Sequence, residues 1–134
     1  MIRILHIVLF VLLFPVQLPV HAAQSSSTPS PYKSLEPPFI VNLNDGKRMR
    51  FLQVKLQALV DKEPLSAPAL ELHMPAVRHE ILMLLSRQDL DTLQTLEGKE
   101  ALLKDITQSV RDSLTRLSGK PGVDQVLMTG FIIQ

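Results

Sequence analysis

The sequence has 134 residues, which is the length of one small domain. It carries 14 basic and 13 acidic side chains, so its formal net charge of +1 gives no global field to attract nucleic acid. Aromatic residues make up 4% of the chain, which leaves few stacking partners for bases. Cysteine is absent, so packing must hold the fold together without disulfides.

The first 23 residues have the pattern of a secretory signal peptide or of an N-terminal membrane anchor. Arg3 gives a short positive region, and residues 4–14 are almost entirely apolar. Residues 20–22 (VHA) form a small-residue cleavage pattern, which favours a signal peptide. Prolines interrupt the apolar run well before the roughly 20 residues that a spanning helix needs. Both interpretations place the rest of the chain outside the cytoplasm.

Residues 24–38 are expected to form a Ser/Pro-rich linker, because five serines and four prolines fall in this stretch. Prolines favour extended conformations, so the linker could reach about 45 Å at about 3.1 Å per residue. It is either a spacer without a role of its own or, if the anchor is retained, a tether that sets the height above a membrane.

Two alternating runs predict a β-hairpin at the start of the folded domain, which is expected over residues 39–134. Residues 39–44 form the first short strand, and the following Asp45-Gly46 pair is a turn signal. In the second run, residues 48–61, Leu52, Val54 and their even-numbered successors alternate with mostly polar residues. A period of two places the apolar set on one buried face.

A helical segment with an interruption is predicted next. Ser66 is the expected N-cap, apolar residues recur at helical spacing up to position 85, and Pro75 should kink or divide the helix. Ser86 with Asp89 resembles a capping box, which predicts a short helix ending near Leu93.

One long helix and a final strand complete the prediction. Thr95 is the expected cap of a helix over residues 97–117 with a single apolar stripe, and Gly119 should end it. Residues 126–133 are apolar at both odd and even positions apart from one threonine. That pattern fits a strand covered on both faces, at the centre of the sheet.

These elements predict an α+β fold, in which a small antiparallel sheet of hairpin and C-terminal strand packs against a kinked helix and one long helix. The residues expected in its core are Phe39, Phe51, Leu52, Val54, Leu56, Ile81, Leu85, Leu103, Ile106, Val110 and Phe131.

A search for catalytic chemistry returns no residue set. The sequence has no H-E-x-x-H, no G-x-S-x-G, no P-loop and no dinucleotide fingerprint. His73 and His79 are six positions apart, which does not place two metal ligands on one helix face. We therefore expect no catalytic, cofactor or metal residue and no enzyme. The basic cluster 47–50 (KRMR) is interpreted as a solvated hairpin end, with a small phosphate- or lipid-headgroup patch as the alternative.

Five segments in order carry a family resemblance: 38–43 (PFIVNL), 50–54 (RFLQV), 75–78 (PAVR), 97–100 (EGKE) and 126–134 (VLMTGFIIQ). Together they resemble the flagellar basal-body-associated protein family FliL. The resemblance covers the whole folded part of the chain and runs to its last residue.

The resemblance implies a stomatin-like (SPFH) domain in the periplasm, associated with the inner membrane at the flagellum. It further implies self-association into a ring, contact with stator units and the basal body, and support of motility without a cofactor. Asn42, Arg50 and Arg78 lie in the matching segments and are the interaction candidates. The alternative hypothesis is a periplasmic ligand- or lipid-binding module on the same scaffold.

Overall fold

The computed structural model describes residues 30–44 and 48–134. Its strands are β1 (Tyr32–Ser34), β2 (Phe39–Asn44), β3 (Met49–Val60) and β4 (Val123–Ile133), and its helices are α1 (Ser66–Leu72), α2 (Met74–Ser86), α3 (Leu90–Gln94) and α4 (Leu96–Ser118). The predicted leader, residues 24–29 of the predicted linker and most of the predicted hairpin turn lie outside the described residues. Within the described ranges, no helix is both long and apolar enough to cross a membrane.

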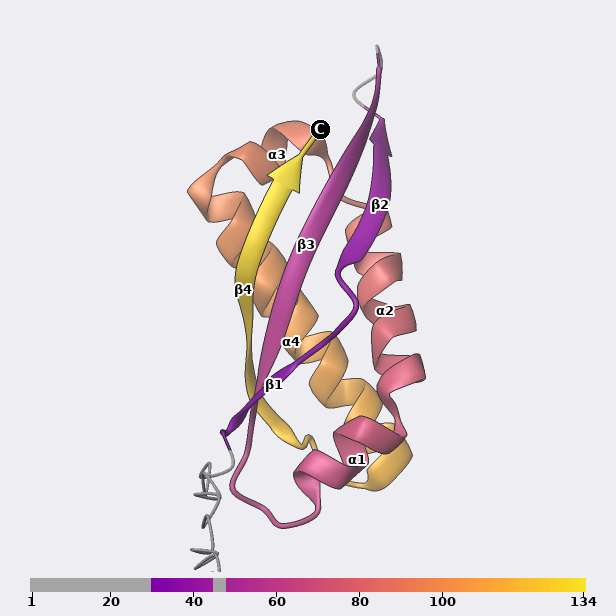
Figure 1. The fold of residues 1–134 in the computed structure, drawn as a ribbon, viewed down its shortest axis with the longest axis vertical. Helices are drawn as coiled ribbons and strands as arrows, with labels where there is room; N and C mark the ends of the chain where they lie inside the picture. Colours follow the sequence, from indigo (N-terminus) through magenta and orange to yellow (C-terminus); the bar gives the residue numbers. More distant parts are fainter. Residues whose placement is uncertain (1–29, 45–47) are drawn as a thin grey trace, which may run out of the picture.

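β3 is the central strand of an antiparallel sheet (Figure 1). It pairs with β4 along one edge, and with β2 and then β1 along the other. The pairing of β2 with β3 closes at Asn44 opposite Met49, so the predicted hairpin of residues 39–44 and 48–61 is confirmed. The α+β class with a small antiparallel sheet is likewise confirmed, whereas the stomatin-like relationship stays a prediction.

The helices α2 and α4 cover one face of this sheet, and the face toward the viewer in Figure 1 has no helix over it. Successive strand residues point to opposite faces, so β3 buries alternate positions against the helices. Most of the expected core residues lie there, each at most 2% exposed: Phe39, Leu52, Val54, Leu56, Ile81, Leu85, Ile106 and Val110.

Three expected core residues lie elsewhere. Phe51 is 49% exposed because it occupies a β3 position that points away from the helices. Leu103 is only partly buried, since its neighbour Leu102, at 1% exposure, takes the inward position on α4. Phe131 packs against the rim of the core and is also partly buried.

The expected kinked helix is divided into α1 and α2 at His73. Pro75 lies in the first turn of α2, where its missing N–H costs no hydrogen bond, but it cannot continue the bonding of the preceding helix. Ser66 is not the N-cap, because it is the first helical residue and Leu65 precedes it in the cap position without a side-chain bond.

The caps of the later helices differ in how well they were predicted. Asp89, and not Ser86, caps α3, because its carboxylate accepts a hydrogen bond from the Thr92 N–H at 3.1 Å. The Ser86 hydroxyl instead donates back to a carbonyl within α2. Thr95 caps α4 as expected, accepting from Gly98 N–H at 3.0 Å, and Gly119 ends it at φ 82°. The long helix, predicted over 97–117, is confirmed.

Residues 32–38 belong to the folded domain and not to a linker. β1 pairs Tyr32 with Leu59 of β3, and Leu35 N–H donates to the Leu56 carbonyl at 3.0 Å. The side chain of Leu35 is 1% exposed, so this segment contributes to the core.

β4 is an edge strand, so its expected place at the centre of the sheet is wrong. Its inner positions meet the core, as Val126 does at 0% exposure. Its outward positions include Leu127 and Ile132, which pair with β3 residues on the face without helices. Residues at both odd and even positions of β4 are therefore apolar because one face of the strand is buried and its exposed face is also apolar.

Candidate interaction surface

The face of the sheet that no helix covers is here called the open face. Most of its apolar side chains are exposed to solvent. Tyr32, Ile40, Phe51 and Ile132 are exposed to 46, 59, 49 and 46%. They come from all four strands, and the registers place them on the same face as the partly buried Leu59 and Leu127. A sheet in contact with water on one side usually carries polar residues there, so this face has the composition of a contact surface.

The registers bring three of these side chains together near the hairpin end. Gln53 lies opposite Ile40 on one side and Ile132 on the other, so the three form one row across the sheet. Phe51 is the next β3 residue on the same face, opposite Asn42. Paired side chains on one face lie about 5 Å apart, so the row and Phe51 form one continuous patch.

The charge on the open face comes from Lys55, which lies opposite Gly130. A Cβ at Gly130 would lie 3.2 Å from the Lys55 side chain, so the glycine leaves room for the lysine stem to cross β4. At the registered positions of β2, β3 and β4 on this face, the described residues include no aspartate or glutamate. A partner with an apolar or weakly acidic surface matches this face.

The three predicted interaction candidates lie in different environments. Asn42 is exposed on the open face beside Phe51. Arg50 lies opposite Leu43 and is half-buried on the other side of the sheet. Arg78 lies on α2, which packs against the face of the sheet opposite the open face. The structure thus brings Asn42 to the open face, whereas sequence reasoning missed Ile40 and Ile132 and assigned Phe51 to the core.

Arg78 holds the connection between β1 and β2 against α2. Its guanidinium donates from Nη1 to the carbonyls of Leu35 and Pro37, both at 2.7 Å, and lies 4.2 Å from the centre of the Phe39 ring. A planar cation can serve two carbonyls and an aromatic face at once. These contacts explain Arg78 within the fold, and a role in partner contact stays a prediction.

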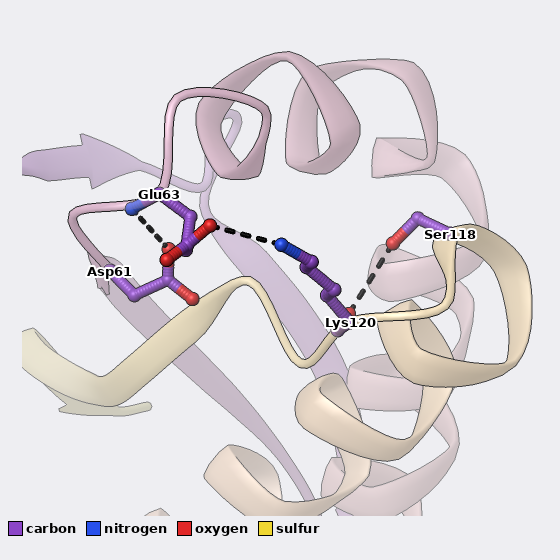
Figure 2. Close-up of polar contacts among 4 residues, drawn as sticks. All are labelled: Asp61, Glu63, Ser118 and Lys120. Atoms are coloured by element: carbon purple, nitrogen blue, oxygen red, sulfur yellow. Dashed lines mark hydrogen bonds and ion pairs between the residues drawn. The ribbon is translucent and has the colours of Figure 1, made fainter.

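A network of polar contacts joins the loop that follows β3 to the segment that follows α4 (Figure 2). Lys120 Nζ contacts a Glu63 carboxylate oxygen at 2.9 Å, and Asp61 accepts from the Glu63 N–H at 3.0 Å. The Ser118 hydroxyl donates to the Lys120 carbonyl at 3.3 Å. The hydrogen bond and charge of Glu63 raise the pKa of Lys120 above its ordinary value. The pair is exposed, so it orders the loops more than it stabilises the domain.

The described residues contain no group of three or more His, Cys, Asp or Glu side chains able to hold a metal ion. What the fold presents instead is a helix-backed sheet with an apolar open face. These features define a class: a small α+β domain with an antiparallel sheet that helices cover on one face only.

Comparison with known proteins gives the family. The model of the family "Flagellar basal body-associated protein FliL" matches residues 32–134. The chain is 34% identical over 112 residues to the Flagellar protein FliL of Escherichia coli (strain K12), covering 84% of this chain and 71% of that protein. The Shigella flexneri protein of the same name matches equally. That of Aquifex aeolicus (strain VF5) is 27% identical over 100 residues, covering 75% of this chain and 59% of that protein. The chain belongs to the FliL family.

Proposed function

We propose that this chain is a non-catalytic accessory protein of the flagellar motor, acting in the periplasm at the inner membrane. In this proposal it supports stator and motor function, and so motility, through protein–protein contacts. Membership of a flagellar basal body-associated family supports the setting. The open face supports the mode of action.

The exposure of Ile40, Phe51 and Ile132 on one face of the sheet is the observation that carries the proposal. These side chains are 59, 49 and 46% exposed, and the β-sheet register places them around Gln53, with Ile40 and Ile132 on either side of it and Phe51 next to it along β3. Monomeric domains rarely keep contiguous apolar surface in water, because burying it against a partner gains about 25 cal/mol per Å². We therefore assign this face to stator or basal-body contact.

We also propose that copies of the chain associate with one another, as a ring in the assembled motor. Head-to-tail association requires two different surfaces on each copy, and the outer edge of β4 and the helical side of the domain are two such surfaces apart from the open face. Sedimentation equilibrium over a range of protein concentrations tests this step. A mass that stays at one chain throughout would contradict it.

The partner-binding test uses a double substitution, Phe51→Ser with Ile132→Ser, in a flagellated host whose own copy is deleted. We expect reduced swimming in viscous medium and loss of co-purification with basal bodies. Leu96→Ser is the matched control, because Leu96 is 66% exposed but lies at the start of α4, away from the open face. The substituted side chains are 49 and 46% exposed and lie outside the core, so circular dichroism and thermal melting should stay close to the parent.

Two outcomes would count against the proposal. If the double variant restores motility as fully as the parent chain, the open face is not the partner surface. If deletion of the chain leaves swimming under high load unchanged, the motor role itself is wrong.

A further inference from the structure

A second apolar surface lies at the end of the domain that carries α1. A groove of about 420 Å³, here called the α1 groove, is lined mainly by Leu65, Pro68, Ala69, Leu72 and Leu117. Leu65 and Leu72 are 73 and 75% exposed, and Leu117 is 42% exposed. Three exposed leucines around one groove form an apolar patch of the kind that marks a binding surface. This patch is separate from the open face, which lies on a different side of the molecule.

Much of the lining of the α1 groove comes from α1, which lies at the same end of the domain as the start of β1 (Figure 1). The Pro31 carbonyl accepts a hydrogen bond from Val60 N–H at 2.9 Å, so the incoming chain meets the last residue of β3. Leu65 follows Val60 by only five positions. The pairing of Pro31 with Val60 therefore holds the start of the domain close to the groove, because both lie at the same end of β3.

The sequence that precedes this junction contains the apolar run of residues 4–14. That run is suited to the interior of a bilayer, whether as a leader or as an anchor. The 15 residues between it and Ser30 can span at most about 50 Å. With the run in a bilayer, the α1 end of the domain is the end tethered to the membrane.

The charges near the α1 groove do not oppose contact with lipid headgroups. Glu71 is paired with Lys33 at 2.8 Å, and Glu63 is paired with Lys120 at 2.9 Å. Each of these carboxylates has an ammonium partner, and Asp61 and Lys62 in the same loop as Glu63 add one charge of each sign, so the surface neither repels nor strongly attracts anionic headgroups. Apolar contact then decides whether the surface binds.

We propose that the α1 groove is a membrane-docking surface, in which Leu65, Leu72 and Leu117 insert into the boundary between headgroups and acyl chains. The domain then contacts the bilayer with its α1 end. The open face stands roughly perpendicular to the membrane plane and stays accessible to other proteins. This contact is separate from any held by residues 1–29, and it does not depend on the flagellar role.

The test exploits the absence of cysteine, which makes any introduced thiol unique. The full chain carrying Leu65→Cys or Leu72→Cys is labelled with an environment-sensitive fluorophore and reconstituted into phosphatidylcholine–phosphatidylglycerol vesicles. Leu96→Cys is the control, because Leu96 is 66% exposed and begins α4 directly after α3, and α3 lies at the opposite end of the domain from α1 (Figure 1). All three positions are exposed, so labelling leaves the core intact.

We expect a blue shift and a several-fold rise in emission at positions 65 and 72, quenched by lipids that carry a nitroxide, with neither effect at position 96. Replacing the anionic lipid by a zwitterionic one should change the signal less than twofold, because the nearby carboxylates are paired. Equal, water-like emission at all three positions would overturn the proposal. Enhanced emission that nitroxide lipids do not quench would also overturn it, since residues 1–29, a second copy or a small ligand would then occupy the groove.

Discussion

Replacing Gly98 by alanine should destabilise the domain, although alanine is the better helix former. A Cβ at this position would lie 2.0 Å from the Thr92 carbonyl oxygen and 2.7 Å from its carbonyl carbon. Both atoms belong to the backbone of α3, so no side-chain rotation relieves the overlap. Helix propensity alone would give Gly98→Ala a gain of up to about 1 kcal/mol. The sign of the change therefore reports the close approach of α3 to α4.

The expected loss in the free energy of unfolding can be estimated from the two elements that the new methyl group would displace, α3 and the first turn of α4. Displacing α3 loosens Leu93, which is 0% exposed, and shifting the first turn of α4 weakens the Thr95 cap of the Gly98 N–H. Overpacking costs about 1–3 kcal/mol and a lost cap about 1 kcal/mol. After the propensity gain is subtracted, we expect a net loss of about 2 kcal/mol in the free energy of unfolding. For a domain of this size, that loss lowers Tm by roughly 10 °C.

Urea denaturation followed by far-UV circular dichroism measures this loss. Gly130→Ala is the matched control, because the three atoms nearest to its new Cβ belong to the Lys55 side chain, at 3.2–3.3 Å, and not to the backbone, so a shift of a few tenths of an ångström relieves the contact. We expect the control to change stability by less than about 0.5 kcal/mol. A Gly98→Ala protein as stable as the parent, or more stable, would refute the packing argument.

Three further predictions concern side-chain contacts. Arg78→Lys should lower the free energy of unfolding by about 2 kcal/mol, because one ammonium cannot serve two carbonyls and also stack on Phe39; unchanged chemical denaturation would contradict this. Thr95→Ala should cost about 1 kcal/mol and Thr95→Ser much less, since serine keeps the capping oxygen; equal losses in thermal melts would argue against the cap. Glu63→Gln should return the raised pKa of Lys120 toward its ordinary 10.5, as NMR titration can measure. A raised pKa in the folded state contributes stability that is fully present at neutral pH and is lost only as pH rises through that pKa. The Lys120–Glu63 pair should therefore give the free energy of unfolding no pH dependence near pH 7.

The hairpin and the long helix were predictable because each buries one face of a regular element. Leu52 and Val54 alternate with polar neighbours on β3, and the apolar stripe of α4 recurs at helical spacing between Thr95 and Gly119. Both patterns are local, so the sequence contains them in full.

Phe51 and the place of β4 were mispredicted for one shared reason. Phe51 stands at an odd position of β3, which the alternation itself assigns to the outer face, but its aromatic ring suggested burial. Leu127 and Ile132 likewise suggested a strand covered on both sides. Apolar character indicates that a residue will be covered, but not whether the cover comes from its own domain or from a partner.

β1 was missed because three residues show no periodicity. Tyr32–Ser34 stands among prolines and serines, which indicate a linker by composition. Its pairing with β3 and the burial of Leu35 depend on contacts more than twenty residues away in sequence. The predicted cap of α3 was wrong by three residues. Ser86 and Asp89 are both good capping residues, and only the backbone conformation decides between them.

The central position of β3 also fixes a distance within the molecule. Its 12 residues run from the hairpin to the α1 end, which at about 3.3 Å per residue amounts to nearly 40 Å. Backbone bonds between Phe51 and Gln134 hold the last residue at the hairpin end, whereas residues 1–29 join at the other. Whatever binds near the hairpin is therefore held about one strand's length from the point where the chain enters the sheet at β1.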